Sequence, residues 1–124
     1  MQTQTDTIGR AFAQALGSKD FDAIDRLLDE QIDFRGMTPR RTWEASGSRE
    51  VIEQILTTWF DESDTLEEIE SIQTDSFADR ERVSYRFRGV NPDGPFVVEQ
   101  QAYYTASDGR ITWMRVLCSG FRPA

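Results

Sequence analysis

The stretch Val83-Ser84-Tyr85-Arg86-Phe87-Arg88 alternates apolar and polar residues, and this alternation decides the fold class of the chain. Successive side chains of a β-strand point to opposite faces of the sheet, so the pattern predicts a strand with one buried face. Two more strands are predicted over residues 96–105 and 111–119. The turn-forming sequences Asn91-Pro92-Asp93-Gly94 and Asp108-Gly109 separate the three strands. The last third of the chain therefore predicts three consecutive antiparallel strands.

Towards the N-terminus, apolar residues recur at helical spacing. They predict one helix over residues 6–17 and a second helix after Asp20, whose side chain suits an N-cap. A third helix is predicted to start at Ser48, and its apolar stripe is formed by Ile52, Ile55, Leu56, Trp59 and Phe60. Between the second and third helices, Ile32-Asp33-Phe34-Arg35 predicts a short strand, which Gly36 and Pro39 are expected to end.

Two segments stay open on local pattern alone. Residues 40–44 fit either a short strand or a loop. Leu66, Ile69 and Ile72 are spaced by three, which favours a helix. Their surroundings are also rich in Ile, Thr and Ser, which fits a strand that leads into a turn at Asp79-Arg80.

Composition limits the class of protein. A length of 124 residues predicts one domain over residues 1–124, and 38% hydrophobic residues predict a globular chain. The net charge of −8 argues against a nucleic-acid or anionic membrane partner, because phosphate groups bind to basic surfaces. We expect no membrane span. The first six residues lack a basic start and an apolar run, so we expect no signal peptide. We expect a cytoplasmic location, because a single cysteine excludes an intrachain disulfide and fits a reducing compartment.

The sequence contains no histidine and one cysteine, Cys118. Catalytic triads with an imidazole base and zinc sites built on histidine are therefore excluded. We expect no metal and no cofactor. Acid–base chemistry would depend on Asp, Glu, Tyr, Lys, Cys or a bound water.

Five short motifs, in this order, carry a family resemblance: Gly17–Ala23, Ile32–Gly36, Thr42–Glu44, Gly47–Glu50 and Asp108–Ile111. The chain resembles the nuclear transport factor 2-like superfamily, and more closely its SnoaL-like members. The resemblance implies an α+β fold, a cone-shaped α+β barrel. In it, a curved, mostly antiparallel sheet wraps around three N-terminal helices and encloses an internal cavity. It also favours a strand for residues 66–77 and a dimer through the outer face of the sheet.

The superfamily includes a ketosteroid isomerase, whose pattern is not matched here. The resemblance puts its helix-one tyrosine at Phe12, its aspartate base at Gly36 or Arg35, and its buried acid at Gln101. An enolising isomerase needs a carboxylate base and an oxyanion donor, so this activity is not expected. The cyclase and epoxide-hydrolase members need a pocket Asp or an Asp-Arg-Asp set, and no such set can be placed.

We predict that alternate residues of the last three strands face the cone interior. These residues are Val83, Tyr85, Phe87, Val97, Glu99, Gln101, Tyr103, Thr105, Thr112, Met114, Val116 and Cys118. Phe12, Leu16, Ile52, Leu56 and Trp59 would join them from the helices. This register makes Glu99 the candidate catalytic acid–base, because burial raises the pKa of a carboxyl group.

The remaining predicted ligand-binding residues are Gln101, Tyr103, Tyr85, Phe87, Trp59, Phe12, Cys118 and Arg35. Structural roles remain open for several of them. Glu99 could instead pair with Arg35 or lie exposed at the mouth of the cone, and Gln101 and Tyr103 could bond to each other. Cys118 could be a small buried hydrophobic residue.

The same register predicts an outer face that carries Arg86, Tyr104, Trp113 and Arg115. Trp, Tyr and Arg are enriched in protein interfaces, so we predict a homodimer through this face.

The predicted fold and register are compatible with three functions. The first is binding of a hydrophobic or polyketide-like small molecule, and the second is hydrolase, cyclase or dehydratase chemistry at Glu99. The third is a non-catalytic dimeric interaction module whose cavity is filled by side chains.

Overall fold

The computed structural model of the chain describes residues 4–124. Residues 1–3, on which part of the signal-peptide expectation rests, lie outside this range. The helices are α1 (Gln4–Gly17), α2 (Phe21–Leu27) and a third helix made of α3 (Ser48–Glu50), the π-helical segment η1 (Val51–Leu56) and α4 (Thr57–Trp59). The strands are β1 (Leu28–Thr38), β2 (Arg41–Ser46), β3 (Thr65–Phe77), β4 (Arg80–Asn91), β5 (Gly94–Ser107), β6 (Arg110–Cys118) and β7 (Arg122–Pro123).

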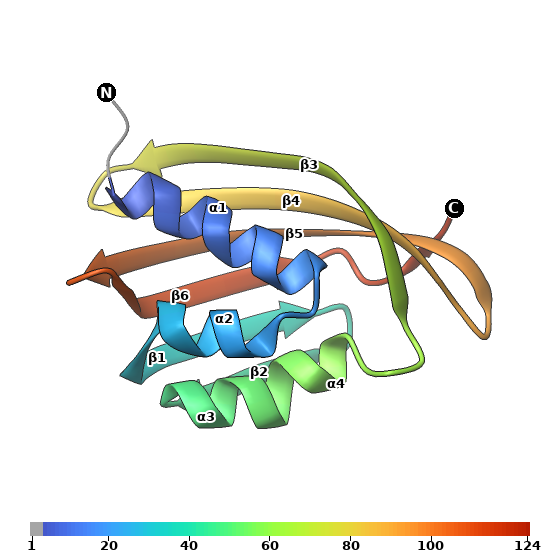
Figure 1. The fold of residues 1–124 in the computed structure, drawn as a ribbon, viewed down its shortest axis with the longest axis horizontal. Helices are drawn as coiled ribbons and strands as arrows, with labels where there is room; N and C mark the ends of the chain where they lie inside the picture. The colour runs from blue at the N-terminus through green and yellow to red at the C-terminus, as the bar shows by residue number, and fades with distance from the viewer. Residues whose placement is uncertain (1–3) are drawn as a thin grey trace.

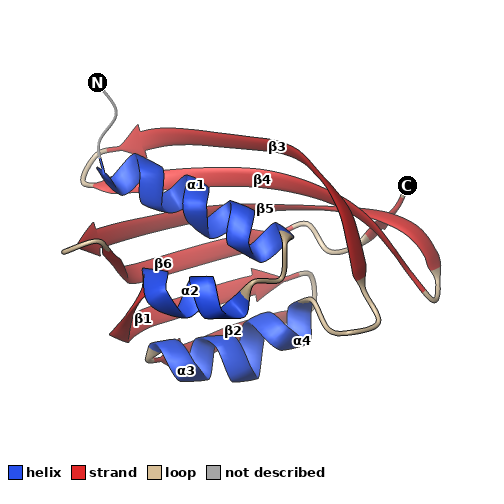
Figure 2. Ribbon diagram, viewed as in Figure 1, coloured by secondary structure: helices blue, strands red, loops and turns tan. Residues whose placement is uncertain are grey.

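The strands form one curved sheet in the order β2-β1-β6-β5-β4-β3, with β7 paired to β5. Among the described strands, β1 and β6 run parallel, and the other neighbouring pairs are antiparallel. The helices lie together on one face of this sheet (Figures 1 and 2). The predicted α+β class and cone-shaped architecture are confirmed, with the sheet left open between its edge strands β2 and β3.

Local signals in the N-terminal half set the element boundaries. The Asp20 carboxylate accepts a hydrogen bond from the Ala23 N–H at 3.1 Å, which caps α2 as predicted. The strand predicted at residues 32–35 is longer and passes through Gly36 to Thr38, so Pro39 ends it and Gly36 does not. Residues 41–46 form a strand, which decides between the two alternatives for residues 40–44.

The segment with ambiguous periodicity is a strand. Residues 65–77 form β3, which pairs with β4 from Thr65 opposite Val90 to Phe77 opposite Arg80. Two irregularities in this pairing explain why the spacing of its isoleucines looked helical, because each shifts the alternation of side chains by one residue. Long-range pairing therefore outweighs local periodicity here.

Aromatic side chains fill much of the space between the helices and the sheet. The ring centroids of Phe12 and Tyr85 are 6.4 Å apart, and those of Phe60 and Phe87 are 6.0 Å apart. Tyr85 and Phe87 stack at 5.1 Å, although both belong to one strand. Edge-to-face and offset contacts of this kind add to the free energy gained by burying the rings.

The register of β5 differs from the prediction. Its buried residues are Phe96, Val98, Gln100, Ala102 and Tyr104, and the residues between them face outward. The two-residue turn between β4 and β5 pairs Asn91 with Gly94, which puts Tyr85 opposite Gln100. Opposite residues of an antiparallel pair share a face, so an inward Tyr85 requires an inward Gln100. The predicted inward direction of Val97, Glu99, Gln101, Tyr103 and Thr105 was therefore wrong.

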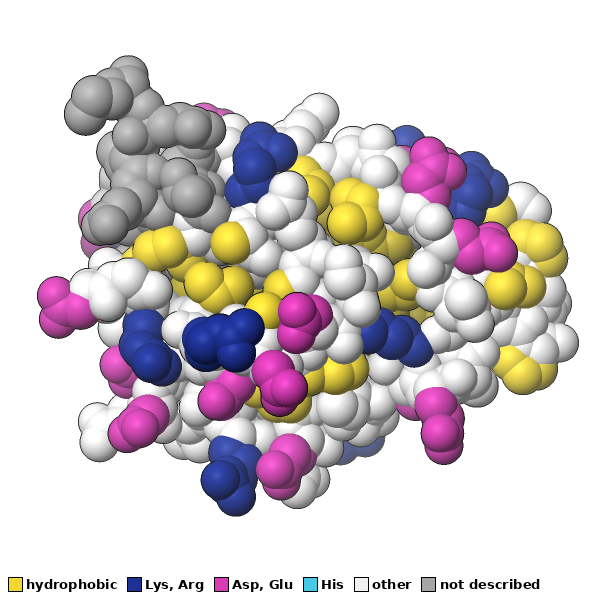
Figure 3. All heavy atoms as spheres, viewed as in Figure 1, with side chains coloured by type: hydrophobic (Ala, Val, Ile, Leu, Met, Phe, Trp, Pro, Cys, Tyr) yellow, Lys and Arg dark blue, Asp and Glu magenta, His cyan; other side chains and the backbone are white. Residues whose placement is uncertain are grey.

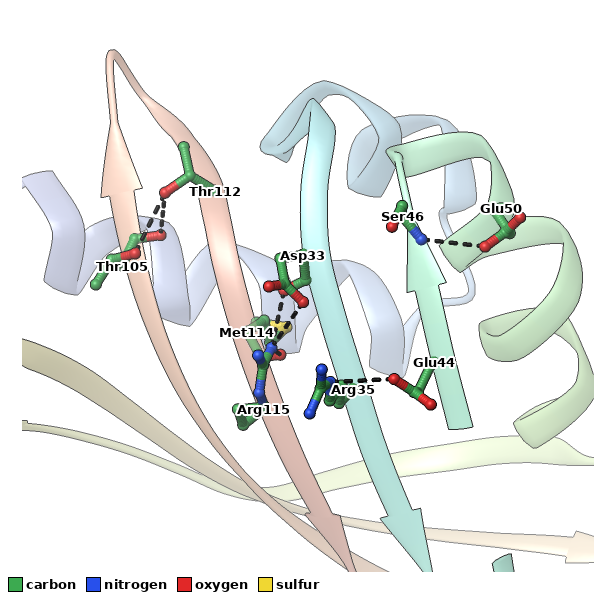
Figure 4. Close-up of polar contacts among 9 residues, drawn as sticks. All are labelled: Asp33, Arg35, Glu44, Ser46, Glu50, Thr105, Thr112, Met114 and Arg115. Atoms are coloured by element: carbon green, nitrogen blue, oxygen red, sulfur yellow. Dashed lines mark hydrogen bonds and ion pairs between the residues drawn. The ribbon is translucent and has the colours of Figure 1, made fainter. Parts of the chain in front are cut away.

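Strand β6 follows the prediction at Met114 and Val116, because of a β-bulge, but not at Thr112. Met114 and Val116 are buried as predicted and lie opposite Tyr104 and Ala102. The pairing shifts between Thr105 and Ala106, where Thr112 is the extra residue of β6. Its hydroxyl lies 3.2 Å from the Thr105 hydroxyl (Figure 4).

Candidate functional site

A polar pair lies within the apolar interior of the cone. The Tyr85 hydroxyl donates a hydrogen bond to Oε1 of Gln100 at 2.6 Å, and the two side chains come from the adjacent strands β4 and β5. Only 2% of Tyr85 and 3% of Gln100 is exposed. Burial raises the pKa of Tyr85 well above 10.0, and the neighbouring Cys118 adds to this effect. The phenol is therefore a neutral hydrogen-bond donor at ordinary pH.

Two buried side-chain hydrogen-bond donors have no partner among the described residues. They are the indole Nε1 of Trp59 and the amide Nε2 of Gln100. Buried polar groups in folded proteins are nearly always paired, so each unpaired group needs a specific explanation. Bound water or a ligand supplies the missing acceptor in such cases.

Trp59 lies at the C-terminal end of the third helix and covers Gly36 of β1. A Cβ atom added at Gly36 would lie 2.5 Å from the indole, which is closer than real Cβ contacts allow. The indole packs 6.0 Å from the Phe34 ring and meets the Trp43 ring edge-on at 6.1 Å. The resemblance put a carboxylate base at Gly36 or Arg35. At Gly36, the indole of Trp59 fills the space that such a side chain would need.

Cys118 extends the polar row across the sheet. It lies opposite Gln100 in the β5–β6 pairing, as Gln100 lies opposite Tyr85 in the β4–β5 pairing. Its side chain is half-buried, and its Sγ accepts a hydrogen bond from the Gly120 N–H at 3.4 Å. Tyr85, Gln100 and Cys118 thus form one continuous row on three neighbouring strands.

Part of the predicted ligand set lies in this interior. Phe12 and Phe87 are fully buried, and Trp59 is 8% exposed. Together with Tyr85 and the half-buried Cys118, they are brought to the inner face of the cone. Gln100, which the predicted register of β5 would turn outward, replaces Gln101 as the inward amide.

Glu99 lies on the outer face of the sheet. Its carboxylate accepts hydrogen bonds from Nε of Arg86 at 2.8 Å and from Nη2 of the same guanidinium at 2.5 Å. The Glu99 side chain is 54% exposed, so it is neither desolvated nor directed into the cone. This position gives no support to an acid–base role inside the cone.

The other outward residues also have partners outside the cone. Gln101 donates to the Tyr103 hydroxyl at 2.9 Å, which was the structural alternative for this pair. Arg35 pairs with Glu44 of β2 at 3.2 Å rather than with Glu99 (Figure 4). The side chains of these three residues, Gln101, Tyr103 and Arg35, therefore do not line the interior of the cone.

The outer face carries a hollow of about 470 Å³ that crosses neighbouring strands. Its lining comprises Ser71, Gln73, Ser84, Arg86, Glu99, Gln101, Leu117 and Ser119, together with Tyr85, Gln100 and Cys118 of the inner row, which lie between them on the same strands. On the same face of the sheet, Trp113 lies between two guanidinium groups, with Arg80 at 4.1 Å and Arg115 at 4.4 Å from the ring. Tyr104 was expected on this face but is fully buried on the inner one.

The opposite face of the molecule is covered by helices. Figure 3 shows acidic and basic side chains interspersed there, with hydrophobic side chains visible between them. A second hollow, of about 670 Å³, has charged residues such as Asp25, Glu53, Arg49 and Arg110 in its lining.

Within the described part of the chain, no group of three or more His, Cys, Asp or Glu residues could hold a metal ion. No helix in this part is long and apolar enough to cross a membrane.

Sequence reasoning missed Gln100, although a signal for it was present. Asn91-Pro92-Asp93-Gly94 is short enough to form a tight hairpin that pairs Asn91 with Gly94. Counting back from that pair sets Tyr85 opposite Gln100. The same count predicts inward positions for Val98 and Ala102, which are both buried.

Comparisons with known proteins agree with this architecture. The family model described as "SnoaL-like domain" matches residues 9–114. No curated protein matches the sequence. A candidate isomerase of Bacillus subtilis has a TM-score of 0.78 and 16% identity over 95% of this chain and 90% of its own.

Two further structures show the same fold. A candidate polyketide cyclase of Xanthomonas campestris has a TM-score of 0.71 and 18% identity over 92% of this chain and 89% of its own. An LEH-like epoxide hydrolase of M. tuberculosis has a TM-score of 0.67 and 18% identity over 94% of this chain and 83% of its own. At such low identity, these likenesses show the fold alone.

Proposed function

This chain belongs to the SnoaL-like domain family, and we propose that it binds a small, mainly apolar molecule inside the cone. The observation that carries this proposal is the pair of unpartnered donors, Trp59 Nε1 and Gln100 Nε2. Ligand sites are commonly apolar pockets in which a few polar groups orient the bound molecule. The interior of this cone has that chemistry.

Aromatic rings supply the apolar contacts of the proposed site. Phe12, Phe87 and Tyr85 line the sheet side and the α1 side, and each is at most 2% exposed. Trp59 is more exposed than these rings, at 8%. A ligand would therefore enter beside Trp59, whose indole also carries one of the unpartnered donors.

Binding can be tested with the neutral fluorescent probe N-phenyl-1-naphthylamine, which brightens in apolar surroundings. We expect saturable enhancement at one probe per chain, and weaker binding in a Trp59→Leu variant. Trp113→Phe is the matched control, because Trp113 lies on the outer face between Arg80 and Arg115. Absence of saturable enhancement in the unaltered protein would contradict the proposal.

A second proposal concerns assembly: the outer face of the sheet joins two copies of the chain. Two exposed apolar side chains support it, since Leu117 is 49% exposed and its β1 neighbour Met37 is 53% exposed. Trp113 and its arginine neighbours lie on the same face, and Trp and Arg are enriched at the centres of interfaces.

Light scattering after size-exclusion chromatography tests this assembly. We expect a dimer at micromolar concentration and a monomer after Leu117→Arg. The control is Asp22→Arg, which introduces the same side chain on the exposed surface of α2. A monodisperse monomer of the unaltered chain would rule out the dimer.

A further inference from the structure

We propose that Lys19 holds a gate closed over the interior of the cone. The gate is the loop of residues 61–64, which follows the third helix, and the ammonium group of Lys19 binds it in the closed position. The inference rests on the proposed binding of a small molecule in the cone. It adds the route by which that molecule enters and the residue that controls its entry.

Lys19 contacts the gate loop across a long separation in sequence. It is the one lysine of the chain, and it lies in the turn between α1 and α2. Its Nζ donates hydrogen bonds to the backbone carbonyl oxygens of Asp61 and Asp64. Residues 61–64 lie between the end of α4 and the start of β3 (Figure 1). One side chain therefore joins the turn after α1 to the loop that leads into the edge strand β3.

The backbone of Lys19 favours a role for its side chain. Its φ angle is +55°, in the left-handed region that costs free energy for residues with a Cβ atom. The Lys19 N–H donates to the Leu16 carbonyl at 3.0 Å and the Asp20 N–H to the Ala15 carbonyl at 2.8 Å, which ends α1. Glycine is the usual left-handed residue at such a helix end. A lysine here bears a backbone cost that glycine would avoid, and its side chain makes the contacts with the gate loop that glycine could not make.

The gate loop is anchored on its other side by β4. The Asp64 carboxylate accepts hydrogen bonds from the Asp61 N–H at 3.3 Å and from Nδ2 of Asn91 at 3.2 Å. Asp64 is 7% exposed, whereas residues 61–63 lie at the surface. Lys19 and Asn91 thus hold the loop from two elements, and Lys19 makes the charged contacts.

The residue directly before the gate loop is Phe60, and its ring lies in the interior. Phe60 is 1% exposed, and its ring centroid lies 6.0 Å from that of Phe87. Phe87 in turn stacks on Tyr85 at 5.1 Å. The rings therefore form a continuous row from the gate loop to the polar pair in the interior. Opening the loop would draw Phe60 out of this row and admit a ligand beside Trp59.

Hydrogen exchange measures the gate loop without any ligand. The amide N–H groups of Asp61, Ser63 and Asp64 are hydrogen-bonded within the loop, so their exchange reports its opening. In Lys19→Met these amides should exchange roughly 10-fold faster, because hydrogen bonds from a charged group are lost. Arg26→Met is the matched control, since it removes one exposed cation from α2 and should leave the exchange unchanged. An unchanged rate in Lys19→Met would overturn the inference.

Stopped-flow fluorescence with N-phenyl-1-naphthylamine tests whether this loop is the entry route. A ligand that passes only through the open form, but is bound in the closed form, enters and leaves at rates set by opening. Lys19→Met should therefore raise the association and dissociation rates by the same factor, with Kd unchanged. Unchanged rates in a variant whose loop exchanges faster would overturn the gate and leave the proposed function intact. A change in Kd through dissociation alone would show that Lys19 contacts the probe, and the inference would fall.

Lys19→Gly separates the ammonium group from the folding of the turn. Glycine fits a φ angle of +55°, so this variant should melt at or above the temperature of Lys19→Met. Its gate loop should nevertheless exchange, and admit the probe, as fast as that of Lys19→Met. Slow exchange in Lys19→Gly would place control of the loop in the backbone of the turn and contradict the inference. Failure of the probe to bind the unaltered protein would instead overturn the proposed function, and the gate as an entry route with it.

Discussion

The Tyr85 hydroxyl donates to Oε1 of Gln100 across the β4–β5 ladder, at a point where both side chains are almost fully buried. A hydrogen bond in such surroundings contributes little net stability when it is complete, but it is costly to leave half made. Tyr85→Phe should therefore destabilise the protein by about 1–2 kcal/mol in urea unfolding, since Oε1 loses its donor.

The double variant Tyr85→Phe with Gln100→Leu tests the coupling. In the Gln100→Leu background, Tyr85→Phe should have little effect, because no buried acceptor remains to be left unpaired. Tyr103→Phe is the control, since this hydroxyl accepts from Gln101 on the outer face. Additive effects of the two inner substitutions would show that the pair is not coupled.

The indole of Trp59 leaves no room for a side chain at Gly36. Gly36→Ala should destabilise the protein by about 1–3 kcal/mol, as expected for overpacking a well-packed core. The cost should shrink in a Trp59→Leu background, because the contact at 2.5 Å is with the indole. An equal cost in both backgrounds, measured by chemical denaturation, would place the strain elsewhere.

Hydrogen bonds from the Ser63 side chain and backbone, followed by the charge of Lys19, lower the pKa of Asp61 below its ordinary 3.8. A carboxyl group with a lowered folded-state pKa contributes stability above its unfolded pKa, and this contribution is lost as pH falls through the folded value. The melting temperature should therefore fall less steeply below pH 3.8 in Asp61→Asn than in the unaltered protein. Asp22→Asn serves as an exposed control, and parallel curves for Asp61→Asn would contradict the prediction.

Tyr85 makes the opposite contribution at alkaline pH. Its folded-state pKa lies well above 10.0, so the unfolded chain loses this proton first as pH rises. The stability contributed by the neutral phenol is full below pH 10 and declines above it. Thermal unfolding should show a smaller loss of stability above pH 10 for Tyr85→Phe than for the unaltered protein. Equal losses would indicate that the phenol ionises without unfolding.

Glu99 and Arg86 form an exposed pair, with side-chain exposures of 54% and 49%. Glu99→Gln should therefore change the free energy of unfolding by less than about 1 kcal/mol, and the change should shrink in high salt. Binding of N-phenyl-1-naphthylamine should not change. A large loss of probe binding would show that Glu99 contributes to the ligand site after all.

Much of the fold could be predicted from local sequence. Asp20 marked the start of α2, and the alternation from Val83 to Arg88 marked the inward face of β4. The order of short motifs then favoured a strand for residues 66–77, against their own helical spacing. These features could be predicted from the sequence because helix capping and the alternation of apolar and polar residues depend on residues only a few positions apart.

The amino-acid sequence by itself determined which residues alternate on each strand and where the tight turns lie. The tertiary structure decided which residues of neighbouring strands lie opposite each other, and therefore which alternating set of each strand faces the helices. The extra residue Thr112 shifts the pairing of β5 with β6, so that Met114 lies on the inner face together with Ala102 and Tyr104. A bulge reverses the alternation for every residue beyond it, and local composition carries little sign of where it forms.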